Sequence, residues 1–112
     1  MTLHILVTGG SRGIGAAIVD ELSDDNVLVH ATSSTDGDLA DPATPSDLWH
    51  NALQELGGRI DVLVNNAGIF EPNPIDSSDI EWLDGWERTM AVNLTAAAQL
   101  CRLAVLHWQA TG

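Results

Sequence analysis

Eight residues near the start of the chain have the types and the spacing that suit the binding of a phosphate group. Residues 8–15 read Thr-Gly-Gly-Ser-Arg-Gly-Ile-Gly and directly follow the apolar run 3–7. Glycines between a strand and a helix let the backbone approach a pyrophosphate closely, and the free amides at the helix start attract its charge. The spacing therefore predicts a dinucleotide-binding turn. A glycine-rich turn that closes a βα unit without any ligand is the alternative.

A second motif, Asn65-Asn66-Ala67-Gly68, ends the run 60–64. Short polar side chains at the carboxyl edge of a strand can tie neighbouring backbone segments together, and a glycine there leaves room for a ribose. For this tetrapeptide alone, an Asn-Gly turn after a buried strand is the simpler alternative.

Together the two motifs resemble those of the short-chain dehydrogenases/reductases, and the resemblance covers essentially the whole chain. It implies an α/β fold with a Rossmann-type, doubly wound parallel sheet, truncated after the fourth helix of the family. Residues 1–112 would be the N-terminal dinucleotide-binding part of a single domain. The implied reaction is hydride transfer between a nicotinamide and a small carbonyl or alcohol substrate.

The cofactor that we expect is NADP. Strand 27–31 ends in Ala-Thr-Ser, without the carboxylate that would repel a 2′-phosphate, and Arg12 would pair well with such a phosphate. This combination is similar to that of NADPH-dependent 3-oxoacyl-carrier-protein reductases. Asp36 and Asp38 keep NAD open as an alternative if the loop folds inwards.

The residues that we expect at the cofactor come from three segments of the chain. Asp38 and Leu39 resemble the acidic-apolar pair that flanks the adenine ring, although a plain turn is the alternative for them. For Arg12 the alternative is a solvated side chain at the helix start. The full set is Gly9, Gly10, Ser11, Arg12, Gly13, Ile14, Gly15, Thr32, Ser33, Asp38, Leu39, Asn66, Ala67 and Gly68.

Asn93 is the one catalytic residue that the resemblance assigns. Trp86, Met90, Asn93 and Ala97 share one stripe of the last predicted helix, and we expect this stripe to face the sheet. The family uses such an asparagine to hold a local helix irregularity and a water that leads to the catalytic lysine. A core asparagine with satisfied hydrogen bonds and no chemical role is the alternative.

The catalytic serine and the Tyr-x-x-x-Lys of the family have no counterpart here. The sequence contains no tyrosine, and all four basic residues are arginines, so it contains no lysine. We therefore expect the 112-residue chain to be inactive by itself. Two other functions stay open, a complete non-catalytic nucleotide-binding module and an inactive truncated fragment; the end of the chain between two elements favours truncation.

The composition of the chain limits the kinds of partner that we expect it to bind. With 16 acidic residues against four basic ones, the formal charge is −12, which argues against nucleic acid and anionic membranes. No run approaches the length of a membrane span, and the first strand leaves no room for a secretory signal, so we expect a cytoplasmic protein. We expect Cys101 to be buried, no metal site at the histidines, and a homo-oligomer formed through the last helix.

The elements that must position these residues alternate along the chain. We expect strands at 3–7, 27–31 and 60–65. We expect a first helix at 13–23, with Ile14, Ile18 and Leu22 buried. A second helix should begin at a Thr44 cap and end at Gly57, and a third should run from a Ser78–Glu81 capping box to about residue 108. The link 32–37 is too short for a crossover helix, so the family's second helix is missing and its third strand is at most a stub.

Overall fold

The computed structural model describes residues 2–111, in which three parallel strands form the sheet. The strands are β1 (Leu3–Val7), β2 (Val27–Ala31) and β3 (Val62–Val64), in the order β2-β1-β3. β1 pairs in register with β2 from Leu3↔Val27 to Val7↔Ala31 and with β3 over Val62–Val64. The first two strands lie at the predicted residues. The third is shorter than the predicted 60–65.

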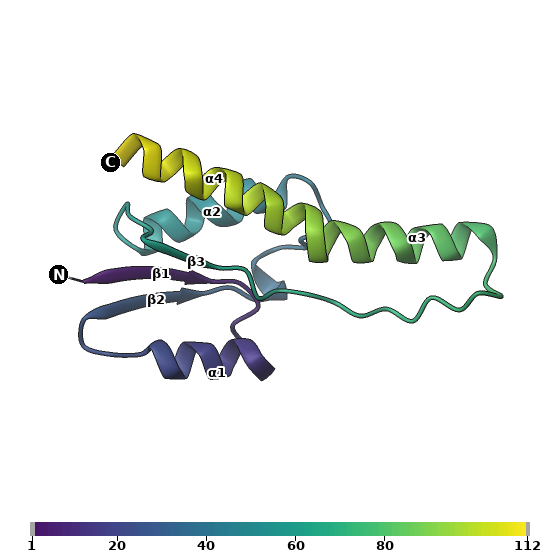
Figure 1. The fold of residues 1–112 in the computed structure, drawn as a ribbon, viewed down its shortest axis with the longest axis horizontal. Helices are drawn as coiled ribbons and strands as arrows, with labels where there is room; N and C mark the ends of the chain where they lie inside the picture. The colour runs from purple at the N-terminus through teal and green to yellow at the C-terminus, as the bar shows by residue number, and fades with distance from the viewer. Residues whose placement is uncertain (1, 112) are drawn as a thin grey trace.

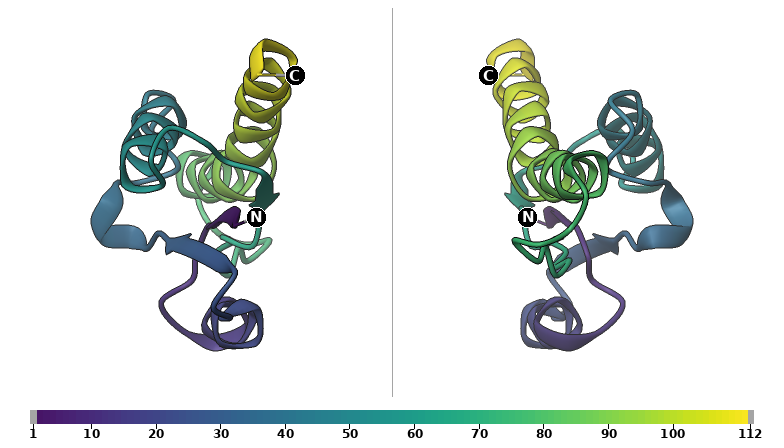
Figure 2. Two further views of the ribbon diagram at one scale, coloured as in Figure 1. Left: turned by 90° about the vertical axis from the view of Figure 1, so that its left-hand side faces the viewer. Right: turned by 90° about the vertical axis from the view of Figure 1, so that its right-hand side faces the viewer.

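Helices cover both faces of this sheet, as a doubly wound fold requires. α1 (Gly13–Leu22) lies on one face, and α2 (Thr44–Glu55) and α4 (Ala96–Thr111) lie on the other (Figures 1 and 2). α3 (Asp79–Met90) and a π-helical segment (Ala91–Thr95) precede α4 and form one continuous rod with it. Figure 1 shows that this rod extends well past the carboxyl ends of the strands, above the long segment that follows β3.

The connection from β2 to α2 contains no crossover helix and no third strand, as the short link predicts. Its regular structure is one 3₁₀ turn, Ser34–Asp36. The turn is held by a reciprocal pair of bonds, in which the Ser33 hydroxyl accepts from the Thr35 amide at 3.3 Å and the Asp36 carboxylate accepts from the Ser33 amide at 2.7 Å.

Of the two predicted helix caps, Ser78 is confirmed, with one of the two bonds of a capping box, and Thr44 is wrong. The Ser78 hydroxyl accepts from the Glu81 amide at 3.2 Å and begins α3. Thr44 is not a cap: it is the first residue of α2, and Ala43 occupies the cap position without any side-chain bond. Thr44 is buried instead, and its methyl group packs closely on Gly37. A Cβ on Gly37 would lie 2.8 Å from the Thr44 Cγ2.

The hydrophobic core lies on the α2–α4 side of the sheet. Its buried members are Leu6, Leu48, Trp49, Ala52, Leu56, Ile60, Leu100 and Ala104. The α1 side is thin, because Gly15 is the one buried residue of α1. The expected apolar face of α1 is therefore only partly correct: Ile18 and Leu22 are half-buried, whereas Ile14 is 76% exposed at the end of the sheet.

The stripe that α3 and α4 bury differs from the predicted one. Val92, Ala96, Leu100 and Ala104 are buried, while Trp86 is 50% exposed and Asn93 is exposed. A π turn adds a residue per turn, which rotates α4 relative to α3, and α3 itself extends beyond the sheet. Cys101, one position past the buried Leu100, is likewise exposed rather than buried.

Asp79–Thr111 forms a 33-residue helical segment that contains an 18-residue window with a mean hydropathy of 1.3. By length and composition this helix could cross a membrane, contrary to the expectation that no segment would qualify. Core helices of soluble proteins meet the same criteria, so this is weak evidence. The absence of a membrane partner stays a prediction.

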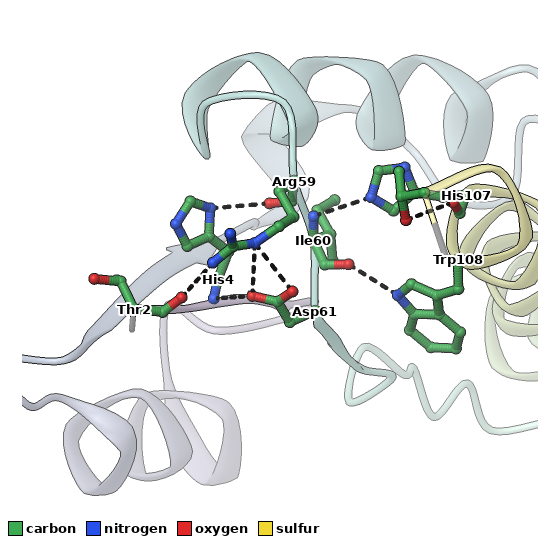
Figure 3. A network of polar contacts seen from close by, with 8 residues as sticks. Thr2, His4, Arg59, Ile60, Asp61, His107 and Trp108 are labelled. Atoms are coloured by element: carbon green, nitrogen blue, oxygen red, sulfur yellow. Dashed lines mark hydrogen bonds and ion pairs between the residues drawn. The ribbon is translucent and has the colours of Figure 1, made fainter.

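A polar network fixes the amino-terminal edge of the sheet (Figure 3). His107 Nε2 accepts from the Ile60 amide at 3.3 Å, and the Trp108 indole donates to the Ile60 carbonyl at 2.8 Å. These two bonds hold the backbone of Ile60, just before β3, to α4. Beside them, the Asp61 carboxylate accepts from the His4 amide at 2.8 Å and from Arg59 Nε at 3.1 Å. Mainly the His4 amide, and then Arg59, lower the pKa of Asp61.

Candidate functional site

A groove of about 840 Å³ opens at the carboxyl edge of the three strands. It is lined by residues from the glycine turn, the segment after β2, the Asn-Asn-Ala-Gly motif and α3. The predicted residues that line it are Gly9, Ser11, Arg12, Gly13, Ile14, Gly15, Thr32, Ser33, Asp38, Leu39, Asn66, Ala67 and Gly68. Gly10 and Asn93 belong to the predicted set but do not line the groove. The sequence motifs are therefore brought together at one place.

The glycine turn has little space for side chains. Gly9 has φ +65°, and a Cβ on it would lie 2.9 Å from the Ala67 Cα. A Cβ on Gly15 would overlap the carbonyl oxygen of Gly9 and lie 2.5 Å from Asn66 Nδ2. At Gly10 a Cβ would lie 2.7 Å from the Ala31 Cβ, so that glycine permits packing on β2 rather than access to the groove. The turn thus presents bare backbone to the groove, as close approach by a phosphate requires.

Asn66 and Thr8 join the two motifs. Asn66 Nδ2 donates to the carbonyl oxygens of Thr8 at 3.2 Å and Gly9 at 3.0 Å. In return the buried Thr8 hydroxyl accepts from the amides of Asn66 at 3.1 Å and Ala67 at 3.0 Å. Thr8 was not among the predicted site residues, although the motif includes it. Its hydroxyl holds the carboxyl ends of β1 and β3 in fixed register.

Arg12 lies at the helix start with extended backbone and is exposed on the groove. Within residues 2–111 it forms no ion pair. The buried Thr32 donates its amide to the Val7 carbonyl at 3.0 Å, and its carbonyl accepts from the Gly10 amide at 2.9 Å. Thr32 therefore links the end of β2 to the glycine turn.

The two aspartates that kept NAD open are both engaged by other groups. Asp36 caps Ser33 and does not line the groove. Asp38 lines the groove and accepts from the Ala40 amide at 3.0 Å and from Arg88 Nη1 at 3.0 Å. The Ala40 amide first, and Arg88 second, lower the pKa of Asp38, while Asp38 raises the pKa of Arg88.

Sequence reasoning missed several residues of the groove. Arg88 lies 50 positions from Asp38, and no local spacing signals that the two meet. Leu48 and Val92 are apolar residues of helical segments, and no local spacing signals their share in the wall. The residues missed are Ser34, Thr35, Gly37, Leu48, Arg88 and Val92. Residues 2–111 contain no cluster of three His, Cys, Asp or Glu side chains that could hold a metal ion.

Asn93 lies in the π-helical segment Ala91–Thr95 beside the groove. Its Oδ1 accepts from the Ile69 amide and its Nδ2 donates to the Ile69 carbonyl, both at 2.8 Å. A Cβ on Gly68 would lie 3.3 Å from Asn93 Oδ1, so Gly68 permits this approach. The helix irregularity expected at Asn93 is present, and the side chain fastens it to Ile69 in the segment that follows β3. Its catalytic role stays a prediction.

Comparison with known proteins gives a consistent result. A family model described as short chain dehydrogenase matches residues 3–112. The rhamnolipids biosynthesis 3-oxoacyl-(acyl-carrier-protein) reductase of Pseudomonas aeruginosa is 36% identical over 81% of this chain and 42% of its own. The 3-oxoacyl-(acyl-carrier-protein) reductase FabG of Haemophilus influenzae is 35% identical over 87% and 46%.

Among solved structures, a short chain dehydrogenase of Burkholderia cenocepacia in complex with NADP superimposes with a TM-score of 0.80. The two chains are 33% identical, and the match covers 94% of this chain and 50% of that one. This chain spans about half the length, or less, of the curated relatives that it matches.

Proposed function

This chain belongs to the short-chain dehydrogenase family, and we propose that it forms the NADP(H)-binding part of an oxidoreductase that acts on a carbonyl or alcohol substrate. The observation that carries the proposal is the bare backbone of the glycine turn, braced by Asn66, at the floor of the groove. When bound, the nicotinamide supplies or accepts the hydride.

The residues present fit such a cofactor. The cradle at Gly9 and Gly15 has no room for a Cβ, and its amides at the start of α1 suit a pyrophosphate. We assign the adenine side to Asp38 and Leu39, and a ribose to the segment Asn66–Gly68. Leu39 packs against the core and is one of the apolar residues of the wall.

The preference for NADP over NAD is part of the proposal. Arg12 has no ion pair among the described residues and faces the groove, so its charge is available for a 2′-phosphate. The hydroxyls of Thr32 and Ser33 add donors there. Among the described residues, Asp36 is the first carboxylate after β2, and it caps Ser33 and does not line the groove.

We further propose that residues 1–112, of which Met1 and Gly112 lie outside the described residues, are the amino-terminal part of one catalytic domain. Asn93 would position a water toward a catalytic lysine, a residue that this sequence does not contain. We also propose a cytoplasmic protein that associates through its last helix. Because the general acid and its lysine partner are absent, the 112-residue chain should not oxidise NADPH with any ketone.

Titration with NADP and NAD by isothermal calorimetry tests the cofactor assignment. Arg12→Ala should lower the affinity for NADP about tenfold, since it removes one charge-assisted bond to phosphate, and should leave NAD affinity nearly unchanged. Arg102→Ala, at an exposed position on α4, is the matched control. Equal losses for both dinucleotides would assign Arg12 to the pyrophosphate or the fold, and no binding of either would overturn the proposed function.

A further inference from the structure

Arg88 joins two segments that border the groove. Its Nη1 lies 3.0 Å from the Asp38 carboxylate, in the segment after β2, and its Nε lies 2.9 Å from the Glu71 carboxylate, in the segment after β3. Arg88 and Asp38 both line the groove, whereas Glu71 does not. The Arg88 guanidinium therefore contributes to the charge of the groove wall and also holds the segments after β2 and β3 in position.

The positive and negative charges along the groove wall nearly cancel. Arg12, Asp38 and Arg88 are the charged residues among those that line the groove in the described part of the chain. With Arg88 the wall has one net positive charge; without it the wall has none, in a chain of formal charge −12. A dinucleotide brings a negative pyrophosphate, and a 2′-phosphate adds about one to two further negative charges. The charge of Asp38 therefore affects the binding of NADP more than the binding of NAD.

The local bonds keep Asp38 ionised and in place. The Ala40 amide donates to its Oδ1 at 3.0 Å, a bond that an asparagine could also accept. The carboxylate side chain is 55% exposed and that of Arg88 is 42% exposed, so water screens the pair and its effect on a ligand is modest.

We propose that Arg88 is a specificity-determining residue that acts through Asp38, because it neutralises the one carboxylate in the described groove wall and so lets the groove accept a 2′-phosphate. The inference rests on the proposed function, that the groove binds a nicotinamide dinucleotide. Arg88 acts on the ligand through Asp38, and we class it as a positioning residue rather than a catalytic one.

The test compares Arg88→Met with Arg88→Lys by calorimetric titration of NADP and NAD into the 112-residue chain. Methionine keeps most of the side-chain length without the charge, whereas lysine keeps the charge and loses the two-pronged contact with Asp38 and Glu71. At low ionic strength Arg88→Met should weaken NADP binding about fivefold and NAD binding about twofold. Arg88→Lys should stay within about twofold of the wild type, and the loss in Arg88→Met should shrink in high salt.

The same substitution in an Asp38→Asn background separates neutralisation from bracing. If Arg88 neutralises Asp38, the double variant has the same net wall charge as the wild type, one positive charge, and should bind NADP within about twofold of the wild type. A loss that persists in that background, or an Arg88→Lys variant as weak as Arg88→Met, would show that Arg88 acts as a brace and would overturn the inference. So would an equal loss for both dinucleotides, or no loss. A wild-type chain that binds neither dinucleotide would overturn the proposed function itself.

Discussion

Gly13 and Gly15 lie in the same turn but have different reasons to be glycine. Gly13 has φ +58° with open space where a Cβ would be, so a side chain there meets only backbone strain. Gly15 is buried in α1, where alanine would favour the helix, but its Cβ would overlap the Gly9 carbonyl. Steric exclusion therefore decides the residue type at Gly15.

We predict that Gly13→Ala lowers the free energy of unfolding by about 1 kcal/mol and Gly15→Ala by about 3 kcal/mol. Urea denaturation followed by circular dichroism measures both variants. Gly15→Ala should also abolish dinucleotide binding, because the turn must shift away from Asn66. A Gly15→Ala variant as stable as the wild type would contradict the tight approach of α1 to β1.

For single residues, the sequence predicts the site residues that belong to a motif. It misses the site residues that only the tertiary fold brings together. The residues of the two motifs could be identified, because their spacing already implies a turn at a strand end. Arg88 could not, since it lies in α3 and meets Asp38 only after two further elements, α2 and β3, have folded between them. The burial of Trp86 was predicted wrongly because helical spacing cannot reveal a π turn downstream.

Among the elements, the start of β3 is tied to β1 by the side chain of Asp61. Asp61 accepts from the His4 amide of β1 and from Arg59, and its pKa in the folded chain lies below 3.8. Since that pKa is lowered relative to the unfolded chain, the contribution of Asp61 is complete above pH 3.8. It is lost as the pH falls through the folded value.

We predict that Asp61→Asn lowers the free energy of unfolding by about 1 kcal/mol at neutral pH, a figure reduced for exposure to solvent. The difference from the wild type should shrink as the pH falls below 3.8. Chemical denaturation over a pH series measures it, with Asp76→Asn, at an exposed position before α3, as the control. A difference that does not change with pH would mean that the carboxylate charge has no role.

The length of each strand shows where local sequence suffices. The runs 3–7 and 27–31 form strands as predicted, because apolar residues continue to a turn or polar segment at each end. The third run forms a strand at Val62–Val64 alone, and Ile60 just before it bonds through its backbone to His107 and Trp108. These bonds come from a helix 47 residues away and leave no trace in the local pattern.

For the whole molecule, an open sheet edge and exposed apolar residues oppose a large negative charge. β3 pairs with β1 alone among residues 2–111, and Trp82, Leu83 and Leu94 are 38–57% exposed on the rod of α3 and α4. An unpaired strand edge and an apolar helix surface both favour association. The formal charge of −12 opposes it at low ionic strength.

We therefore predict that the chain self-associates more strongly as the salt concentration rises. Sedimentation velocity over a salt series measures the change, and Leu94→Glu should reduce it, because a charge would enter the rod surface. Gln109→Glu, which adds the same charge at an exposed position near the end of α4, is the control. A chain that stays monomeric at every salt concentration would show that the sheet edge and the rod do not drive self-association.

Amide NMR shows whether the groove at the carboxyl edge of the sheet binds a nicotinamide dinucleotide. NADP is added to the isotope-labelled 112-residue chain, and the shifted amides are mapped. If the groove is the binding site, shifts should appear at residues 9–15, 32–39 and 66–68, and none at His4, Asp61 or Trp108 at the opposite edge. Shifts centred on that opposite edge, or no shifts at saturating NADP, would contradict binding in the groove.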